Sequence, residues 1–362
     1  MWPQAVQMRG QELITGDGGD VGQTRIVIAG AGRFGTLHAR TWAEAGARIS
    51  GVVDVDGAAA ERLAEAHNAA VHGAELKQVL ENASPDAVVI ATDENSHAPL
   101  AQEALKHGSS VFIEKPFALD VPSARLITAT AAERNLHAFA GHISRFAQPY
   151  TRLRSSIMKG AFGDVWALRL RRDFSRSWYE SFGDRVHPAW ESGVHDADLA
   201  IFLTASRPRK VYAIQSEAAG KAAPSVISSV IEMENGVNVT IESAWALPDR
   251  APQSLAGVLA LDGTIAAECE VIGSRGVAKQ RLVSEALTEW CDSGIMSPDL
   301  TLWPEIDGEV GGALRAEVDA ALAVFRGERP NTVMPHEQAV ESVRLIDALV
   351  RSLEQEAPVL LD

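Results

Sequence analysis

The chain has 362 residues, more than a single hydrophobic core usually organises, so the sequence predicts two domains. Its composition is globular, with 46% hydrophobic and 22% charged residues, and 48 acidic residues against 33 basic ones give a formal net charge of −15. This charge disfavours nucleic acid and anionic membrane surfaces, and no apolar stretch has the roughly 18 residues of a membrane span, so a small-molecule partner is expected.

Two cysteines, Cys269 and Cys291, are too few for a disulfide framework or a cysteine zinc site. They fit a reducing cytoplasm, which is the location that we expect. Residues 1–24 lack the apolar core of a secretory signal, and we interpret them as a flexible extension.

Residues 25–141 alternate short apolar runs with helical patterns, which is the rhythm of a doubly wound parallel sheet. The expected strands lie in the runs RIVIA, RISGVVDVD, DAVVIAT, SSVFIEK and LHAFA. Between them, segments rich in alanine and leucine have helical spacing, and APLAQEALKHG ends at Gly108, a typical helix C-cap. We therefore expect an α/β domain over this range.

A glycine-spaced turn follows the first expected strand. Gly30, Gly32 and Gly35 have the spacing G-x-G-x-x-G, in which the glycines allow a tight turn, the approach of a pyrophosphate and close packing of the next helix. That helix begins near Arg33 and Phe34, and its free N–H groups would face the phosphates. The turn predicts a Rossmann dinucleotide site.

An acid is also needed at the end of the second strand, about 20 residues beyond the glycines, to bind the adenosine ribose hydroxyls. Asp54 has this position, and Asp56 is a competing candidate two residues later. A carboxylate there would repel a 2′-phosphate. NAD is therefore expected rather than NADP.

Residues 142–362 predict a second domain, of the α+β class with a large, mostly antiparallel open sheet. Long alternating runs such as VWALRLRRD, KVYAIQSE and SVISSVIEME are typical strands, with hairpin turns expected at Asn235-Gly236 and Asp262-Gly263. From Leu314 onward the pattern returns to helices, with Pro330 and Pro335 between two of them.

Some of these strands carry apolar residues on both sides of the alternation, notably SVISSVIEME and VNVTIESAW. A sheet covered by helices on one face only would expose them, and such patches usually mark interfaces. We expect a homodimer or a homotetramer.

Several segments, in order, resemble the glucose-fructose oxidoreductase / inositol dehydrogenase / rhizopine catabolism (Gfo/Idh/MocA) family. They are the glycine motif with His38 soon after it, ATDENSHAPLAQEAL, FIEKPFALD, GHISRFAQP and ESGVHDADLAIFL. The resemblance implies a Rossmann domain joined to an α/β domain whose open sheet carries the substrate site and commonly the subunit interface. It also implies cofactor contacts at Thr92, Asn95, His97 and Glu114.

Lys115 ends a buried parallel strand, where ligands bind in open α/β sheets. The resemblance implies that this lysine lies beside the nicotinamide and binds a substrate hydroxyl. The alternative is a lysine that extends from the strand end into solvent.

The segment HPAWESGVHDADLAIFL is similar to a family pattern D-x-G-x-H, with Gly193 and His195 in place and Glu191 at the aspartate position. The resemblance implies a catalytic set of Lys115, Glu191 and His195, in which His195 is the general base and Glu191 sets its tautomer and basicity. Two alternatives remain: a metal shared with His187, which we do not expect, or an ordinary pair on a helix surface.

Three further side chains are substrate-binding candidates. Arg145 matches a family arginine near the active site, and its alternative is a salt bridge at the domain junction. Trp178 and Trp190 flank the histidine segment, where they would stack on a sugar ring or pack in the core.

The resemblance thus implies an NAD-dependent oxidoreductase that acts on a secondary alcohol of a sugar, cyclitol or related polyol, or on the corresponding ketone. The alternative is a non-catalytic nucleotide- and sugar-binding regulatory protein of the same fold.

Overall fold

The computed structural model describes residues 23–178, 183, 185–217, 224–249, 253–254, 264–282, 286–292 and 294–361. The expected extension before residue 23 and the expected turn at Asp262-Gly263 lie outside these ranges. In the described part of the chain, no helix is both long and apolar enough to cross a membrane.

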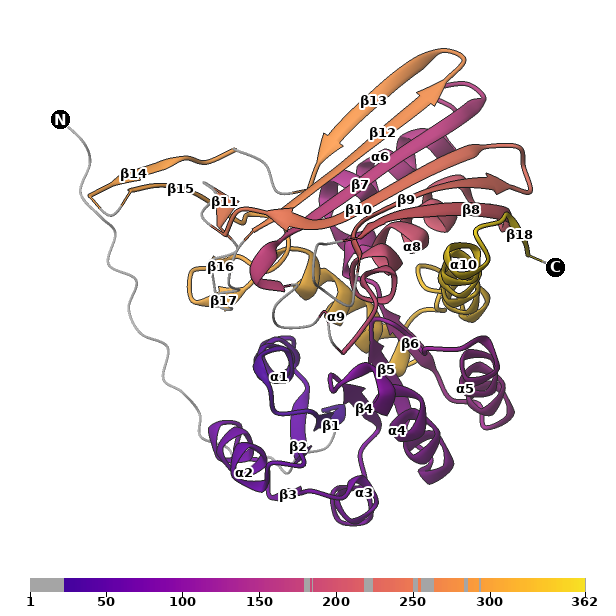
Figure 1. Cartoon of the computed structure of the whole chain (residues 1–362). Helices are drawn as coiled ribbons and strands as arrows, with labels where there is room; N and C mark the ends of the chain where they lie inside the picture. Colours follow the sequence, from indigo (N-terminus) through magenta and orange to yellow (C-terminus); the bar gives the residue numbers. More distant parts are fainter. Residues whose placement is uncertain are drawn as a thin grey trace.

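The first domain is built on a six-stranded sheet in the order β3-β2-β1-β4-β5-β6, with every neighbouring pair parallel (Figure 1). Its strands are β1 (Arg25–Ala29), β2 (Arg48–Val53), β3 (Val71–Gly73), β4 (Ala87–Ile90), β5 (Ser110–Glu114) and β6 (Ala138–Gly141). Its helices are α1 (Arg33–Glu44), α2 (Gly57–Ala66), α3 (Leu76–Ala83), α4 (Glu94–His107) and α5 (Val121–Glu133). The strand order reverses between β1 and β4, which opens a crevice at their carboxyl ends. The expected doubly wound sheet is confirmed.

The second domain contains a seven-stranded sheet in the order β13-β12-β7-β10-β9-β8-β18. The strands are β7 (Val165–Ser175), β8 (Pro208–Glu217), β9 (Pro224–Met233), β10 (Asn238–Leu247), β12 (Ile265–Gly273), β13 (Gly276–Arg281) and β18 (Val359–Leu360). The β7–β10 pair is parallel and the other pairs are antiparallel, so the sheet is mostly antiparallel, as expected. The β9–β10 hairpin turns at Asn235-Gly236, where Gly236 has a φ of 84°.

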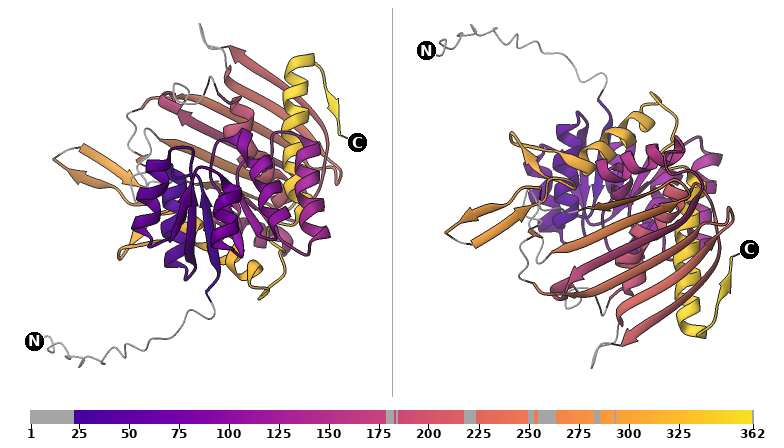
Figure 2. Two further views of the ribbon diagram at one scale, coloured as in Figure 1. Left: turned by 90° about the horizontal axis from the view of Figure 1, so that it is seen from below. Right: turned by 90° about the horizontal axis from the view of Figure 1, so that it is seen from above.

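Helices cover one face of this sheet (Figure 2). The helices in contact with it are α6 (Gln148–Met158), η2 (Ala189–Gly193), α8 (Val194–Thr204) and α10 (His336–Gln355), and the domain also contains η1 (Ile143–Phe146) and α9 (Gly312–Phe325). Short strands complete the domain: β11 (Gln253–Ser254), β14 (Glu289–Cys291), β15 (Gly294–Pro298), β16 (Glu305–Ile306) and β17 (Glu309–Val310).

The opposite face of the sheet has no helix over it among the described residues (Figure 2). Apolar side chains are exposed there at one end of the sheet: Tyr212, Ile214, Val230 and Leu360. We call these four residues the outer patch.

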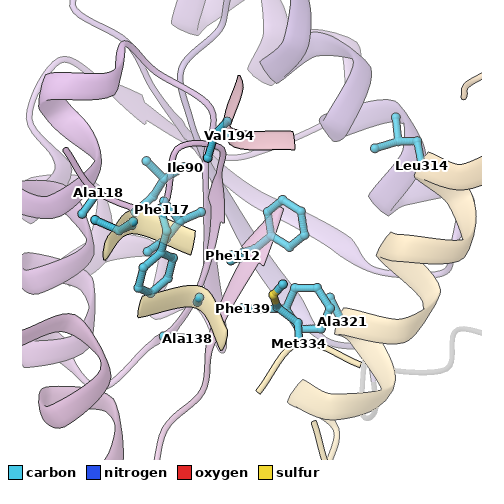
Figure 3. Close-up of a cluster of buried hydrophobic side chains, with 14 of the residues drawn as sticks. Ile90, Phe112, Phe117, Ala118, Ala138, Phe139, Val194, Leu314, Ala321 and Met334 are labelled. Atoms are coloured by element: carbon cyan, nitrogen blue, oxygen red, sulfur yellow. The ribbon is translucent and has the colours of Figure 1, made fainter. Parts of the chain in front are cut away.

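Helix α9 leaves the second domain and packs on the first. Trp42 of α1 stacks on Phe325, with ring centroids 6.0 Å apart, and is fully buried. Figure 3 shows Ala321 of α9 close to Met334 and the buried ring of Phe139. The hydrophobic core is therefore continuous across the two domains.

Candidate active site

The glycine turn has the geometry of a phosphate-binding turn. A Cβ on Gly30 would collide with the Ala91 carbonyl, and one on Gly35 would collide with the Gly30 carbonyl, so both positions require glycine. Gly32 has no atom within 4 Å of its ideal Cβ position and leaves open space above the start of α1. No side chain caps this helix, so the N–H groups of Arg33 and Phe34 face that space. The turn fits a dinucleotide pyrophosphate.

Asp54 lies beside this turn at the carboxyl end of β2. Its carboxylate accepts hydrogen bonds from the N–H groups of Ala31 (2.6 Å) and Asp56 (2.8 Å). Asp56 instead caps α2 through the N–H groups of Ala58 and Ala59. Asp56 thus acts as a helix cap, whereas Asp54 lies beside the glycine turn.

Thr92, in the loop after β4, is partly exposed, and Asn95, in the first turn of α4, is exposed. His97 differs, because it is buried and its ring nitrogens lie 2.8 Å from the Pro116 carbonyl oxygen and 3.4 Å from that of Thr92. The structure therefore gives His97 a supporting position beneath the Lys115–Pro116 turn, in place of the expected cofactor contact.

Glu114 also supports this turn. Its Oε1 accepts a hydrogen bond from His38 Nε2 (2.8 Å), and its Oε2 accepts one from the Lys115 N–H (3.1 Å). Burial opposes the carboxylate charge, but the His38 hydrogen bond and the charges of His38 and Lys115 hold the pKa of Glu114 below its ordinary value. Both oxygens are engaged within the chain, and the cofactor contact at Glu114 that the resemblance implies stays a prediction.

Lys115 and Glu191 form a buried salt bridge between the two domains. Lys115 Nζ lies 2.7 Å from Glu191 Oε1 and 3.3 Å from the Glu191 carbonyl oxygen. The side chains are 16% and 9% exposed. The lysine is therefore fixed at the carboxyl end of β5, and the alternative of a lysine extending freely into solvent does not hold.

Glu191 reaches the lysine because the chain forms a π-helical turn, η2, before α8. Ser192 fixes this turn, since its Oγ accepts a hydrogen bond from Trp245 Nε1 (3.0 Å) and lies 2.6 Å from Ser243 Oγ on β10. Such turns widen the helix by one residue and are frequent at functional sites. The carboxylate then faces Lys115 across the domain junction.

His195 follows in the first turn of α8, and its Nδ1 is buried without a hydrogen-bond partner in the described structure. Burial, together with the positive charges of Arg172 and Lys115, holds the pKa of His195 well below its ordinary value. The expectation that Glu191 orients His195 and raises its basicity is wrong, because that carboxylate is bound to Lys115.

Two residues that the sequence did not single out complete the surroundings of His195. Arg172 of β7 and Asp196 form a fully buried bidentate pair, with Nε–Oδ2 at 3.0 Å and Nη2–Oδ1 at 2.9 Å. One signal was available: Asp196 and Asp198 stand in the otherwise apolar helix VHDADLAIFLT, where buried carboxylates must be paired.

Arg145 does not face the site. It is 1% exposed and binds Asp198 through Nε (2.8 Å) and Nη2 (2.6 Å), while Nη1 donates to Val333 and Gln338. The substrate-binding prediction is corrected to its alternative, an internal salt bridge, because the donors of this guanidinium already have acceptors inside the protein.

The two tryptophans are partly buried and pack against the core. Trp178 lies against Phe174, with ring centroids 4.6 Å apart, and Trp190 forms part of η2 beside Glu191. His187 is fixed in the preceding turn, where its Nδ1 accepts the N–H of Ala189 (3.2 Å). No cluster of three or more metal-ligating side chains was found among the residues that the structure describes.

Comparison with known proteins agrees with this architecture. The model of an oxidoreductase family with an NAD-binding Rossmann fold matches residues 24–142, and that of the GFO/IDH/MocA C-terminal domain matches residues 150–279. Inositol 2-dehydrogenase of Rhizobium meliloti (strain 1021) is 30% identical over 191 residues, which are 52% of this chain and 57% of the relative. The rhizopine catabolism protein MocA of Rhizobium meliloti is 24% identical over 340 residues, covering 92% of this chain and 96% of that protein.

Solved structures share the fold over nearly the whole chain. GenD2 from gentamicin A biosynthesis, in complex with NAD, has a TM-score of 0.79 at 21% identity and covers 99% of this chain and 100% of its own. The scyllo-inositol dehydrogenase of Lactobacillus casei, with NAD(H) and scyllo-inositol, has a TM-score of 0.79 at 20% identity, covering 94% and 99%.

The matched region spans 57% to 66% of the length of the first inositol 2-dehydrogenases compared. The two family models together account for more than half of the chain, one for each domain. With an NAD-binding Rossmann domain followed by the matching C-terminal domain, the chain belongs to the GFO/IDH/MocA oxidoreductase family.

Proposed function

We propose that the protein is an NAD-dependent dehydrogenase or reductase that acts on a secondary alcohol, or the corresponding ketone, of a sugar, cyclitol or related polyol. The observation that carries the proposal is the Lys115–Glu191 salt bridge at the mouth of the Rossmann crevice, next to a histidine of low basicity. A regulatory protein that only binds nucleotide and sugar has no need for this arrangement.

The cofactor would be bound by this chain's own turn and strand ends. The N–H groups at Gly32, Arg33 and Phe34 would bind the pyrophosphate, and Asp54 would accept hydrogen bonds from the ribose hydroxyls. When bound, the nicotinamide supplies the redox chemistry by exchanging a hydride with the reacting carbon. The Asp54 carboxylate supports a preference for NAD over NADP.

Lys115 would donate a hydrogen bond to the reacting oxygen. Its ammonium group has three donors, and Glu191 engages part of them on one side. Glu191 therefore sets the direction of the lysine, which makes it a positioning residue. Holding a donor in place before the substrate arrives is worth more than supplying a free one.

His195 would accept the proton of the alcohol. Its pKa lies well below 6.5, so the ring is neutral and able to accept a proton at neutral pH. Protonation of the ring beside Arg172 and Lys115 is unfavourable, so the accepted proton would be passed on readily to solvent.

Three further points are part of the proposal. The polyol class is supported by relatives named inositol 2-dehydrogenase. A cytoplasmic location is supported by the two free cysteines, Cys269 and Cys291. Assembly into a homodimer or homotetramer is supported by the outer patch.

The test measures the reduction of NAD with a panel of inositols, aldoses and alditols. Lys115 and His195 are then replaced in turn. Lys115→Ala and His195→Ala should each lower turnover by about 100-fold or more on the best substrate. His195→Ala should leave the NAD affinity nearly unchanged. Absence of turnover with every member of the panel would refute the proposed function, and wild-type rates in both variants would refute the roles of Lys115 and His195.

A further inference from the structure

A pocket of about 690 Å³ lies where α6, α8 and α9 meet the linker between α9 and α10. Four arginines line it, Arg145, Arg152, Arg154 and Arg329, and no aspartate or glutamate does. This composition contrasts with the whole chain, whose formal net charge is −15. A concentration of positive charge in an acidic protein calls for a physical explanation.

The charge of three of these arginines is not balanced locally. Arg145 is neutralised by Asp198 in a buried bidentate pair. Arg152 and Arg329 form no ion pair with any residue that the structure describes. Arg154 donates to the Leu203 carbonyl oxygen (3.2 Å) but has no carboxylate partner in the same part of the chain. The pocket thus has about three positive charges in excess.

One of these arginines is held in place before any ligand arrives. The guanidinium carbon of Arg154 lies 5.4 Å from the centroid of the Phe202 ring, and that of Arg145 lies 5.0 Å from the same ring. Burial and the neighbouring Arg145 charge lower the pKa of Arg154. Arg154 thus lies against the same ring as Arg145 but, unlike Arg145, has no carboxylate partner among the described residues, so an anion in the pocket would stabilise its charge.

The buried carboxyl group of α9, Glu317, does not neutralise the positive charge of the pocket. Glu317 follows Ala316, which lines the pocket, but it is completely buried. Burial and the negative charges of Glu114 and Asp198 raise the pKa of Glu317 well above its ordinary value, which disfavours its charged form. Among the described residues, no carboxylate lines the pocket to balance Arg152, Arg154 and Arg329.

We propose that this pocket binds a small phosphorylated anion, whose phosphate is held by Arg152, Arg154 and Arg329. A phosphate group at neutral pH carries about −1.5 to −2 charges and accepts the paired N–H groups of guanidinium forks. Ser155, Thr332 and Gln148 also line the pocket and offer hydroxyl and amide donors for the phosphate or its substituent. Ligand pockets of about 300–1,000 Å³ accommodate molecules of this size.

The proposal does not depend on the reaction at Lys115, and the test separates the two. Inorganic phosphate is titrated into the full chain saturated with NAD, so that the glycine turn is occupied, with potassium chloride holding the ionic strength constant. Isothermal titration calorimetry should detect binding to the wild type. The double variant Arg152→Gln/Arg329→Gln should bind phosphate at least about tenfold more weakly, because it loses two charge-assisted contacts. The matched control Arg125→Gln, which removes an exposed arginine of α5 outside the pocket, should bind like the wild type.

Glucose 6-phosphate and glucose then distinguish a phosphate ester from free phosphate. If the wild type binds the ester more tightly than inorganic phosphate and the double variant does not, the ligand is a phosphorylated metabolite. Equal binding of the two would indicate free phosphate. Absence of phosphate binding to the wild type, equal binding to the double variant, or tighter binding of succinate than of phosphate would each overturn the proposal.

Discussion

At the scale of single residues, changes at Glu191 test whether its carboxylate positions Lys115 or instead sets the basicity of His195. Glu191→Gln removes the charge that holds Lys115 Nζ at 2.7 Å but leaves one oxygen as an acceptor. We expect turnover to fall by about 10- to 100-fold, because a misplaced donor is costly, with little change in NAD affinity. Steady-state kinetics with the best polyol would measure this loss.

Glu191→Asp is the sharper comparison. The change retracts the carboxylate by about 1 Å and should also lower turnover, since Lys115 would lose its hydrogen-bond partner. Activity equal to or above that of the wild type would contradict the positioning role. Glu133→Asp, a change on the surface of α5, is a control for shortening a glutamate elsewhere.

The pH dependence of the reaction follows from the low pKa of His195. Since a base must be unprotonated in the free enzyme, kcat/KM for alcohol oxidation should decline only as the pH falls through that lowered pKa. The acidic limb is thus expected below about pH 6.5, the ordinary value for histidine. A limb at or above neutral pH would show that Glu191 raises the histidine pKa after all.

Asp54 should control the choice between the two nicotinamide cofactors. Asp54→Asn keeps one oxygen for the ribose and for the Ala31 N–H but removes the negative charge that repels a 2′-phosphate. We expect the preference for NAD to shrink by about tenfold, because an unscreened charge pair near a protein surface is worth more than 1.4 kcal/mol. Fluorescence titrations of NAD and NADP would measure it. An unchanged ratio of the NAD and NADP affinities would show that Asp54 does not determine the cofactor preference.

At the scale of elements, the sequence predicts strands and turns well where the local pattern decides. The runs that form β1, β4, β5 and β6 have four consecutive buried residues each, and Gly30 and Gly35 stand where no side chain fits. Strand β3 (Val71–Gly73) was not predicted, because three half-exposed residues carry no periodic signal.

The partner of Glu191 could not be predicted, since it depends on a single backbone irregularity. A regular helix would place Glu191 and His195 on one face, four residues apart. The π-helical turn η2 changes that relation, and Ser192, Ser243 and Trp245 stabilise it through contacts between distant parts of the chain. The resemblance therefore names Lys115, Glu191 and His195 as candidates, but their spacing along the sequence does not predict which of them pair.

Helix α8 depends on its two buried ion pairs. Asp196→Ala would leave the buried Arg172 guanidinium without a counter-charge, which costs about 3–5 kcal/mol. The melting temperature should fall by about 6 °C or more, as followed by circular dichroism. Asp319→Ala, which breaks an exposed pair with Arg315 on α9, should change it by less than about 2 °C. Equal effects of the two changes would contradict the importance of the buried pair.

At the scale of the whole molecule, the outer patch should be buried between copies of the chain. Val230 is 54% exposed near the centre of this patch, and a lysine there would place a charge in the interface. Light scattering at micromolar concentration should show a dimer or tetramer for the wild type and a smaller species for Val230→Lys. Leu126→Lys, at an exposed position on α5, should keep the wild-type mass. A monomeric wild type would disprove the expected assembly.

Long-range architecture is where the sequence is least informative. Alternating patterns predict the strands of the second sheet, but nothing local indicates that β7 pairs in parallel with β10, some 70 residues later. Likewise, the apolar face of α9 does not indicate that this helix packs against the first domain. Both features arise from which surfaces meet after the chain has folded back on itself.

The stacking of Trp42 on Phe325 bears on the order of events during synthesis. The N-terminal domain emerges from the ribosome before α9 is made. In the nascent chain, the surface of α1 around Trp42 is therefore exposed to water. Arg326 adds hydrogen bonds to Thr24 and Gly46, at the very start of the described structure. The nucleotide-binding half is thus finished only by residues translated near the end, which ties its maturation to completion of the whole polypeptide.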